Sequence, residues 1–68
     1  MRYAVVIEKA GAGYSGYVPD LPGCVAAGAS VGAVKAALAE VIPFHLEGLR
    51  EGGEAVALPE SVVEWVEV

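Results

Sequence analysis

The sequence predicts an α+β fold in which one long helix packs on one face of a four-stranded mixed sheet. Short runs rich in β-branched and aromatic residues, separated by glycine and proline, predict three strands before residue 28 and a fourth at the C-terminus. Between them, residues 31–51 show helical spacing of apolar side chains. A helix of this length can form a crossover connection, which would place the last strand parallel to one already in the sheet. We therefore expect the element order β-β-β-α-β and the strand order 3-2-1-4.

The four expected strands are defined by local composition. A flexible Ala-Gly-Ala-Gly reversal should separate the first strand from the second. Side chains alternate along a strand, so Tyr14, Gly16 and Val18 share one face of the second strand, and Tyr17 lies on the other. The expected strands cover residues 3–7, 14–18, 24–27 and 62–68.

A proline-rich turn follows the second strand. Pro19 lacks an N–H group and should end regular pairing. Pro22 and Gly23 fit the two central positions of a type II turn, because proline fixes the first φ and glycine accepts a positive second φ. Asp20, between the two prolines, is expected to accept hydrogen bonds from backbone N–H groups just ahead of it.

The helix has clear signals at both ends. Ser30 is a good N-cap, and the pair Gly52–Gly53 should end the helix in a left-handed C-cap. Pro43 removes one backbone hydrogen bond and should kink or split the helix. Glu40, Glu47 and Glu51 fall on the side away from the sheet. The apolar stripe expected to face the sheet consists of Val31, Val34, Leu38, Val41, Ile42, His45 and Leu49.

Length and charge restrict the classes of protein to consider. The 68 residues form one domain, residues 1–68, and a chain this small buries little surface without association. The net charge is −5, and the four scattered cations make no patch that would neutralise a phosphate backbone, so we do not expect direct DNA or RNA binding. An acidic surface suits a basic protein partner. No apolar run is long enough for a membrane helix and no signal peptide is evident, so a cytoplasmic protein is expected.

Few residues could carry catalysis. His45 falls in the apolar stripe of the helix, where packing is the simpler interpretation. Cys24 is the only cysteine, and we interpret it as a small buried residue. The acidic residues do not converge on the centre of the expected sheet, as a two-metal nuclease would require, so we expect no metal, no other cofactor and no enzymatic activity.

One helix can cover only one face of the expected sheet. The other face would expose apolar side chains, and large exposed patches usually mark an interface. Phe44 projects away from the apolar stripe, so either the kink at Pro43 turns it inward or it anchors a partner or a second subunit. Trp65 on the fourth strand presents the same choice. We expect a homodimer or higher homo-oligomer with Phe44 and Trp65 as candidate interface residues.

The segment from Tyr14 to Gly28 resembles the signature of the HicB-like antitoxin family, in which an aromatic strand is followed by V-P-D-L-P-G-C and a glycine before a helix. The resemblance extends over nearly the whole chain. It implies the same β-β-β-α-β layout, described as a truncated ribonuclease-H-like fold. The residues that carry it are Tyr14, Gly16, Val18, Pro19, Asp20, Leu21, Pro22, Gly23, Cys24 and Gly28.

The resemblance also implies a function. A HicB-like protein masks a HicA-like toxin, a small basic ribonuclease, and would do so by covering the basic catalytic surface. Full-length members commonly carry a further DNA-binding segment, and no such segment is expected after Val68. The loop residues that match the motif and would contact the toxin are Tyr17, Asp20, Leu21, Pro22 and Gly23.

Two other functions stay open. The chain could be an orphan, self-associating scaffold with no toxin partner. It could also be a small enzyme or ligand-binding protein, which would need a pocket lined by His45, Cys24 and a carboxylate.

Overall fold

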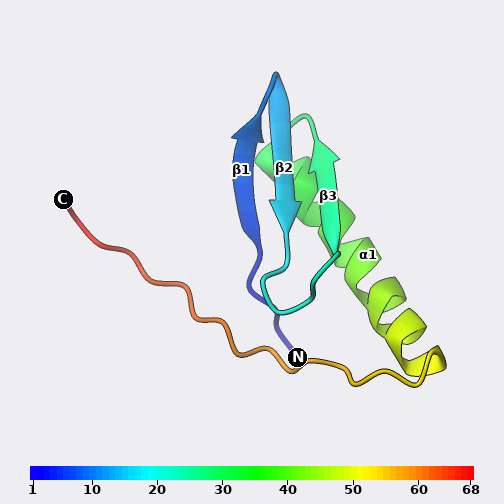
Figure 1. The fold of residues 1–68 in the computed structure, drawn as a ribbon. Helices are drawn as coiled ribbons and strands as arrows, with labels where there is room; N and C mark the ends of the chain where they lie inside the picture. The colour runs from blue at the N-terminus through cyan, green and yellow to red at the C-terminus, as the bar shows by residue number, and fades with distance from the viewer.

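The computed structural model describes all residues, 1–68, and shows a three-stranded antiparallel sheet with one helix across one face (Figure 1). The strand order is β1-β2-β3, so each strand pairs with its neighbour in sequence. The elements are β1 (Val6–Ala10), β2 (Gly13–Tyr17), β3 (Val25–Gly28) and α1 (Val31–Glu51).

The predicted fourth strand is wrong, and with it the mixed sheet of order 3-2-1-4 and the β-β-β-α-β order. Residues 62–68 form no strand and run away from the sheet in Figure 1. The segment before them is held at the loop end of the sheet, where the Tyr3 hydroxyl donates to the Ala57 carbonyl at 2.7 Å. From there the chain passes beside residues 2–4, which precede β1. Residues 62–68 therefore do not reach an edge strand of their own sheet, although their composition favours a strand.

The first strand lies later in the chain than predicted. The turn between β1 and β2 has only two residues, because Ala10 pairs with Gly13, and Gly11 adopts a φ of 59°. This short turn draws the charged residues Glu8 and Lys9 into β1, whereas Tyr3 to Val5 remain outside it.

The sheet and the helix pack closely because Gly16 has no side chain. A Cβ atom at this position would lie 2.7 Å from Cγ1 of Val34 and 3.1 Å from Cδ1 of Leu38. Val31 and Val41 of the predicted stripe are exposed, and Leu46 was missed. The buried core consists of Val18, Leu21, Cys24, Val34, Leu38 and Leu46.

Both predicted ends of the helix are confirmed. The Ser30 hydroxyl accepts a hydrogen bond from the Ala33 N–H at 3.1 Å. At the other end Gly53, with a φ of 71°, is the left-handed residue, and the N–H groups of Gly53 and Glu54 bond to the carbonyls of Arg50 and Leu49. This pair of hydrogen bonds is a Schellman motif. The helix does not split at Pro43.

Candidate protein-binding surface

One face of the sheet is left open by the helix. Gly16 faces α1, so the alternating residue Tyr17 faces the other way. Tyr17 pairs with Val6 on β1 and with Val25 on β3, which makes an apolar row across all three strands. Tyr17 is 43% exposed and Val25 is 62% exposed. We call Val6, Tyr17 and Val25 the open-face row.

The predicted turn follows this row. The Cys24 N–H donates to the Leu21 carbonyl at 3.1 Å, and Gly23 has a φ of 84°, as a type II turn requires. Leu21 is only 1% exposed, so it holds the loop on the core and presents no side chain to a partner. Pro22 and Gly23 are exposed at the tip of the loop.

Asp20 binds a different part of the chain from the one expected. Its Oδ2 accepts hydrogen bonds from the backbone N–H groups of Ser61 at 3.1 Å and Glu60 at 3.2 Å, and its Oδ1 accepts from the Ser61 hydroxyl at 2.9 Å. These bonds, that from the Ser61 N–H foremost, lower the pKa of Asp20 below its ordinary value. The expectation of bonds to the N–H groups just ahead of Asp20 was wrong. Asp20 instead fixes the start of the C-terminal segment.

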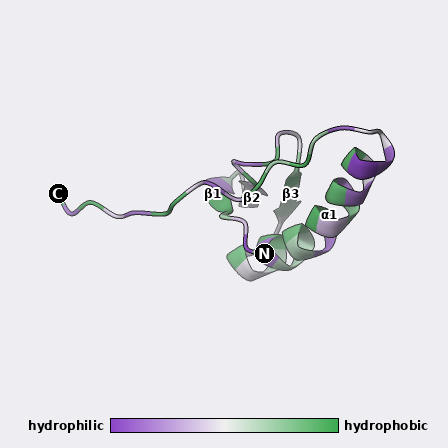
Figure 2. Ribbon diagram, turned by 90° about the horizontal axis from the view of Figure 1, so that it is seen from below, coloured by the Kyte–Doolittle hydropathy of each residue, from purple (hydrophilic) through white to green (hydrophobic).

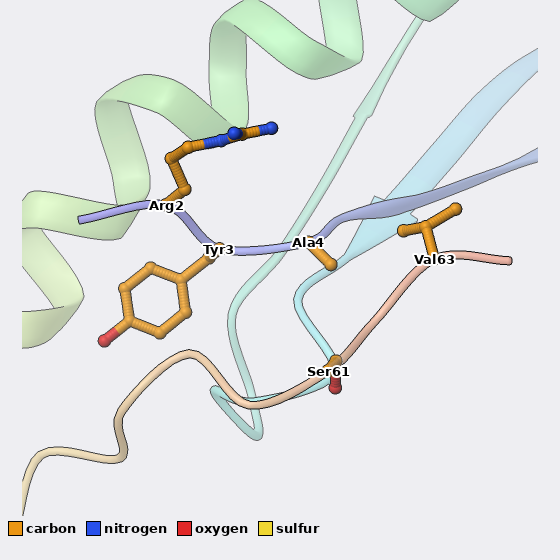
Figure 3. Close-up of a pocket in the computed structure, with 5 residues that line it drawn as sticks. All are labelled: Arg2, Tyr3, Ala4, Ser61 and Val63. Atoms are coloured by element: carbon orange, nitrogen blue, oxygen red, sulfur yellow. The ribbon is translucent and has the colours of Figure 1, made fainter.

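The C-terminal segment begins beside the N-terminus. Ser61 and Val63 line a small surface pocket with Arg2, Tyr3 and Ala4, and Figure 3 shows the two stretches of chain passing each other there. Beyond this point the segment leaves the domain (Figure 1). We call residues 62–68 the tail; all of its residues are exposed, and Trp65 is 88% exposed.

Phe44 lies on the outer side of α1 and is 82% exposed. It lines a second surface pocket with Glu47, Gly48 and Glu51. Pro43 therefore does not turn the ring inward, and that alternative was wrong.

The structure does not bring His45, Cys24 and a carboxylate together in one pocket. Cys24 is buried, and burial raises the pKa of its thiol. His45 is half-buried on α1. Neither residue lines either surface pocket. No three His, Cys, Asp or Glu side chains are grouped as metal ligands would be.

Charge is distributed unevenly along the chain. Two of the four cations, Arg2 and Lys9, lie in or just before the edge strand β1, and Lys9 Nζ sits 5.6 Å from the centre of the Tyr14 ring. Residues 51–68 contain five glutamates and no cation. Figure 2 shows hydrophilic residues concentrated on the last turns of α1.

The helix lacks the length of apolar sequence that crossing a bilayer requires.

Comparison with known proteins identifies the family. A family model described as HicB_like antitoxin of bacterial toxin-antitoxin system matches residues 3–68. The chain belongs to this family. The HicB-like chain is also 35% identical over 66 residues to an uncharacterized 14.9 kDa protein from the rep-hol intergenic region of Haemophilus phage HP1 (strain HP1c1). The match covers 97% of the HicB-like chain and 50% of the phage protein, so the chain spans about half the length of this curated relative.

The family is described as that of the antitoxins of bacterial toxin–antitoxin systems. The sequence prediction of the family is confirmed. Of the five motif residues predicted to contact a partner, the structure leaves Tyr17, Pro22 and Gly23 exposed at one end of the sheet. It places Leu21 in the core and engages Asp20 with the segment that precedes the tail. Sequence reasoning missed Val25, although its position opposite Tyr17 follows once the register is known.

Proposed function

We propose that this antitoxin neutralises a HicA-like toxin, a small basic ribonuclease, by covering its catalytic surface. The observation that supports this is the open-face row, an exposed apolar strip on the face that no element of the chain covers. Tyr17 would be its central contact, since tyrosine is enriched among the residues that dominate binding energy. Pro22 and Gly23 would extend the contact at the loop tip, while Leu21 and Asp20 hold the loop in shape.

Charge supports the choice of a basic partner. The net charge of −5 attracts a positively charged ribonuclease over a distance and raises the rate of encounter. Such steering weakens with salt, because the Debye length falls to about 8 Å at physiological ionic strength. We therefore expect the association rate to fall as salt is raised, with a smaller change in the dissociation rate.

The test is a titration of a HicA-like ribonuclease with the antitoxin. Calorimetry measures the binding, and an RNA cleavage assay measures the remaining ribonuclease activity. Tyr17→Ala should weaken binding about tenfold or more, as loss of a central aromatic contact does. It should restore RNA cleavage at antitoxin concentrations that inhibit fully with the unmodified chain. Val31→Ala is the matched control, because Val31 is 49% exposed at the start of α1, on the layer opposite the open face.

Two results would contradict the proposal. The first is the absence of binding between this chain and any basic ribonuclease tested. The second is equal affinity of Tyr17→Ala and unmodified chain for the toxin, which would move the contact to another surface.

Self-association is a second candidate, favoured by the exposure of Phe44 and Trp65. Under this proposal Phe44 anchors a second subunit through the outer side of α1. Phe44→Ala should then lower the sedimentation mass, and an unchanged mass would remove Phe44 from the interface.

A further inference from the structure

The outer side of α1 carries an exposed aromatic ring among carboxylates. Phe44 is 82% exposed, so its ring adds nothing to the core. Glu40 lies four residues before Phe44 and Glu47 three after it, and residues at these spacings are neighbours on a helix surface. Glu51 follows one turn beyond Glu47 and is exposed as well. We call Glu40, Phe44, Glu47, Gly48 and Glu51 the outer helix face.

A surface hollow lies beside the ring. It measures about 290 Å³ and is lined by Phe44, Glu47, Gly48 and Glu51. A Cβ atom on Gly48 would meet no atom within 4 Å, so close packing does not require a glycine at this position of the helix. The volume is at the lower limit of small-molecule pockets, about 300–1,000 Å³, and only the ring contributes an apolar wall. The hollow therefore suits a single side chain of another protein better than a cofactor.

The charge around this hollow is negative. Residues 40–54 contain four glutamates and one arginine. The C-terminus of α1 adds the equivalent of about half a negative charge, because the last carbonyl groups of a helix have no intrahelical partner. Figures 1 and 2 show the last turns of α1 extending beyond the strands, where a second protein can reach them. A positively charged occupant is therefore favoured.

Several residues of this face are unfavourable for the helix itself. Gly48 is a poorer helix former than alanine. Glu47 and Glu51 are four residues apart, and like charges at this spacing repel each other. Glu51 also lies in the last turn, where the helix dipole disfavours an acidic side chain. Local conflicts of this kind are expected at functional sites, where they are compensated by binding.

We propose that the outer helix face binds an arginine side chain from a segment of a basic protein. A planar guanidinium group can stack on the Phe44 ring and form two parallel hydrogen bonds with the carboxylate of Glu47 or Glu51. Its aliphatic stem would lie over Gly48. Lysine fits less well, because its ammonium group is a point charge without this planar geometry. A second copy of the chain also fits less well, because the glutamates of the two faces would repel each other.

This surface is separate from the toxin contact proposed above. The open-face row lies on one side of the sheet, and α1 covers the other side. The outer helix face is the far side of α1, so the sheet and the helix stand between the two surfaces. A toxin held on the open-face row would leave Phe44 accessible. The occupant is therefore a second basic partner, which could bind the antitoxin with its toxin in place.

An NMR titration of the full chain tests the proposal. The probe is a blocked alanine peptide with arginine at every fourth position, and the amide signals of residues 44–51 should shift when it is added. The same peptide with lysine should bind more weakly. Phe44→Ala should weaken binding of the arginine peptide about two- to fivefold, as loss of an exposed cation–π contact does. Glu47→Gln should also weaken it, whereas Glu64→Gln, the same change of charge in the tail, should have little effect.

Gly48→Ala separates binding from folding. The added methyl group favours the helix and occupies the hollow, so this variant should unfold at a higher urea concentration and yet bind the arginine peptide less tightly. Gly32→Ala is the matched control, because a Cβ there also meets no atom within 4 Å and lies at the other end of α1. It should not change the affinity for the peptide.

Three results would overturn the proposal. The first is equal peptide affinity of the unmodified chain, Phe44→Ala and Gly48→Ala. The second is a lower sedimentation mass of Phe44→Ala, which would assign the face to a second copy. The third is loss of toxin inhibition in Phe44→Ala, which would assign it to the toxin. The toxin contact is tested separately through Tyr17→Ala, so failure of this proposal and failure of the proposed function give different results.

Discussion

At the scale of single residues, Asp20 determines how the two ends of the fold are joined. Its carboxylate accepts three hydrogen bonds from Glu60 and Ser61, 40 and 41 residues away in sequence. A carboxylate bound by N–H and O–H donors is favoured in its charged form, which explains the direction of the pKa change. Asp20, a motif residue predicted to contact a partner, thus has a structural role in the free chain: it holds residues 60 and 61 against the loop.

Replacing Asp20 by Asn should release the segment before the tail. The amide keeps one acceptor oxygen but loses the charge, and it presents an NH2 group to donors that need an acceptor. The amide resonances of Glu60 and Ser61 should shift toward random-coil positions in a two-dimensional NMR spectrum. Glu40→Gln makes the same change of charge on the exposed side of α1 and should leave both resonances in place. Unchanged Ser61 resonances in Asp20→Asn would show that these bonds do not hold the segment.

The same contact predicts a pH dependence with a defined sign. Because the pKa of Asp20 is lower in the folded state, its contribution is fully present above the ordinary value of 3.8 and is lost as pH falls through the lowered value. The Ser61 resonance should therefore be constant between pH 5 and pH 8 and should move toward random coil only below about pH 3.8.

At the scale of elements, the helix is defined by its two caps. Gly53 occupies the left-handed position, with a φ of 71°, whereas the neighbouring Gly52 has an ordinary helical φ of −78°. Gly53→Ala should lower the free energy of unfolding by about 1 kcal/mol, since a Cβ is strained in the left-handed region. Gly52→Ala should not lower it. Urea unfolding of the two variants makes the comparison, and equal midpoints would contradict the assignment of the cap.

The elements also show why some predictions from sequence succeed. Ser30, the pair Gly52–Gly53 and the Pro22–Gly23 turn act on residues within a few positions, and all three predictions are confirmed. The start of β1 was predicted wrongly because register depends on the length of the turn it shares with β2. The fourth strand failed for a longer-range reason: strand preference in the tail is local, whereas pairing needs an edge that the path of the chain does not reach.

The candidate surface was predictable in part for the same reasons. Alternation along the second strand placed Tyr17 on the face of the sheet opposite to that of Gly16, and the structure agrees. The family motif could not show that Leu21 packs in the core, because the identity of an apolar loop residue does not reveal whether its side chain is buried or exposed. No local signal in the sequence indicated that Asp20 would bind Ser61. That any of these residues contacts a toxin stays a prediction.

At the scale of the whole molecule, stability depends on a core of six side chains and on one glycine. Gly16 lets α1 lie directly on β2, since any side chain at this position would overlap Val34. Small domains have marginal stability, so a change at this contact should alter the population of unfolded chains measurably.

Cys24 provides a probe of this global stability. Its side chain is 1% exposed and its thiol pKa is raised by burial, so a thiol reagent should react with it at neutral pH only when the domain opens. When opening and closing are fast, the reaction rate follows the open population. Gly16→Ala overpacks the contact with Val34 and should cost about 1–3 kcal/mol, which speeds labelling about fivefold or more. Gly48→Ala is the control, because a Cβ there meets no atom within 4 Å; it should stabilise the helix by about 1 kcal/mol and slow labelling about fivefold. Fast labelling of the unmodified chain, or the same rate in all three chains, would show that Cys24 is reached without opening of the core.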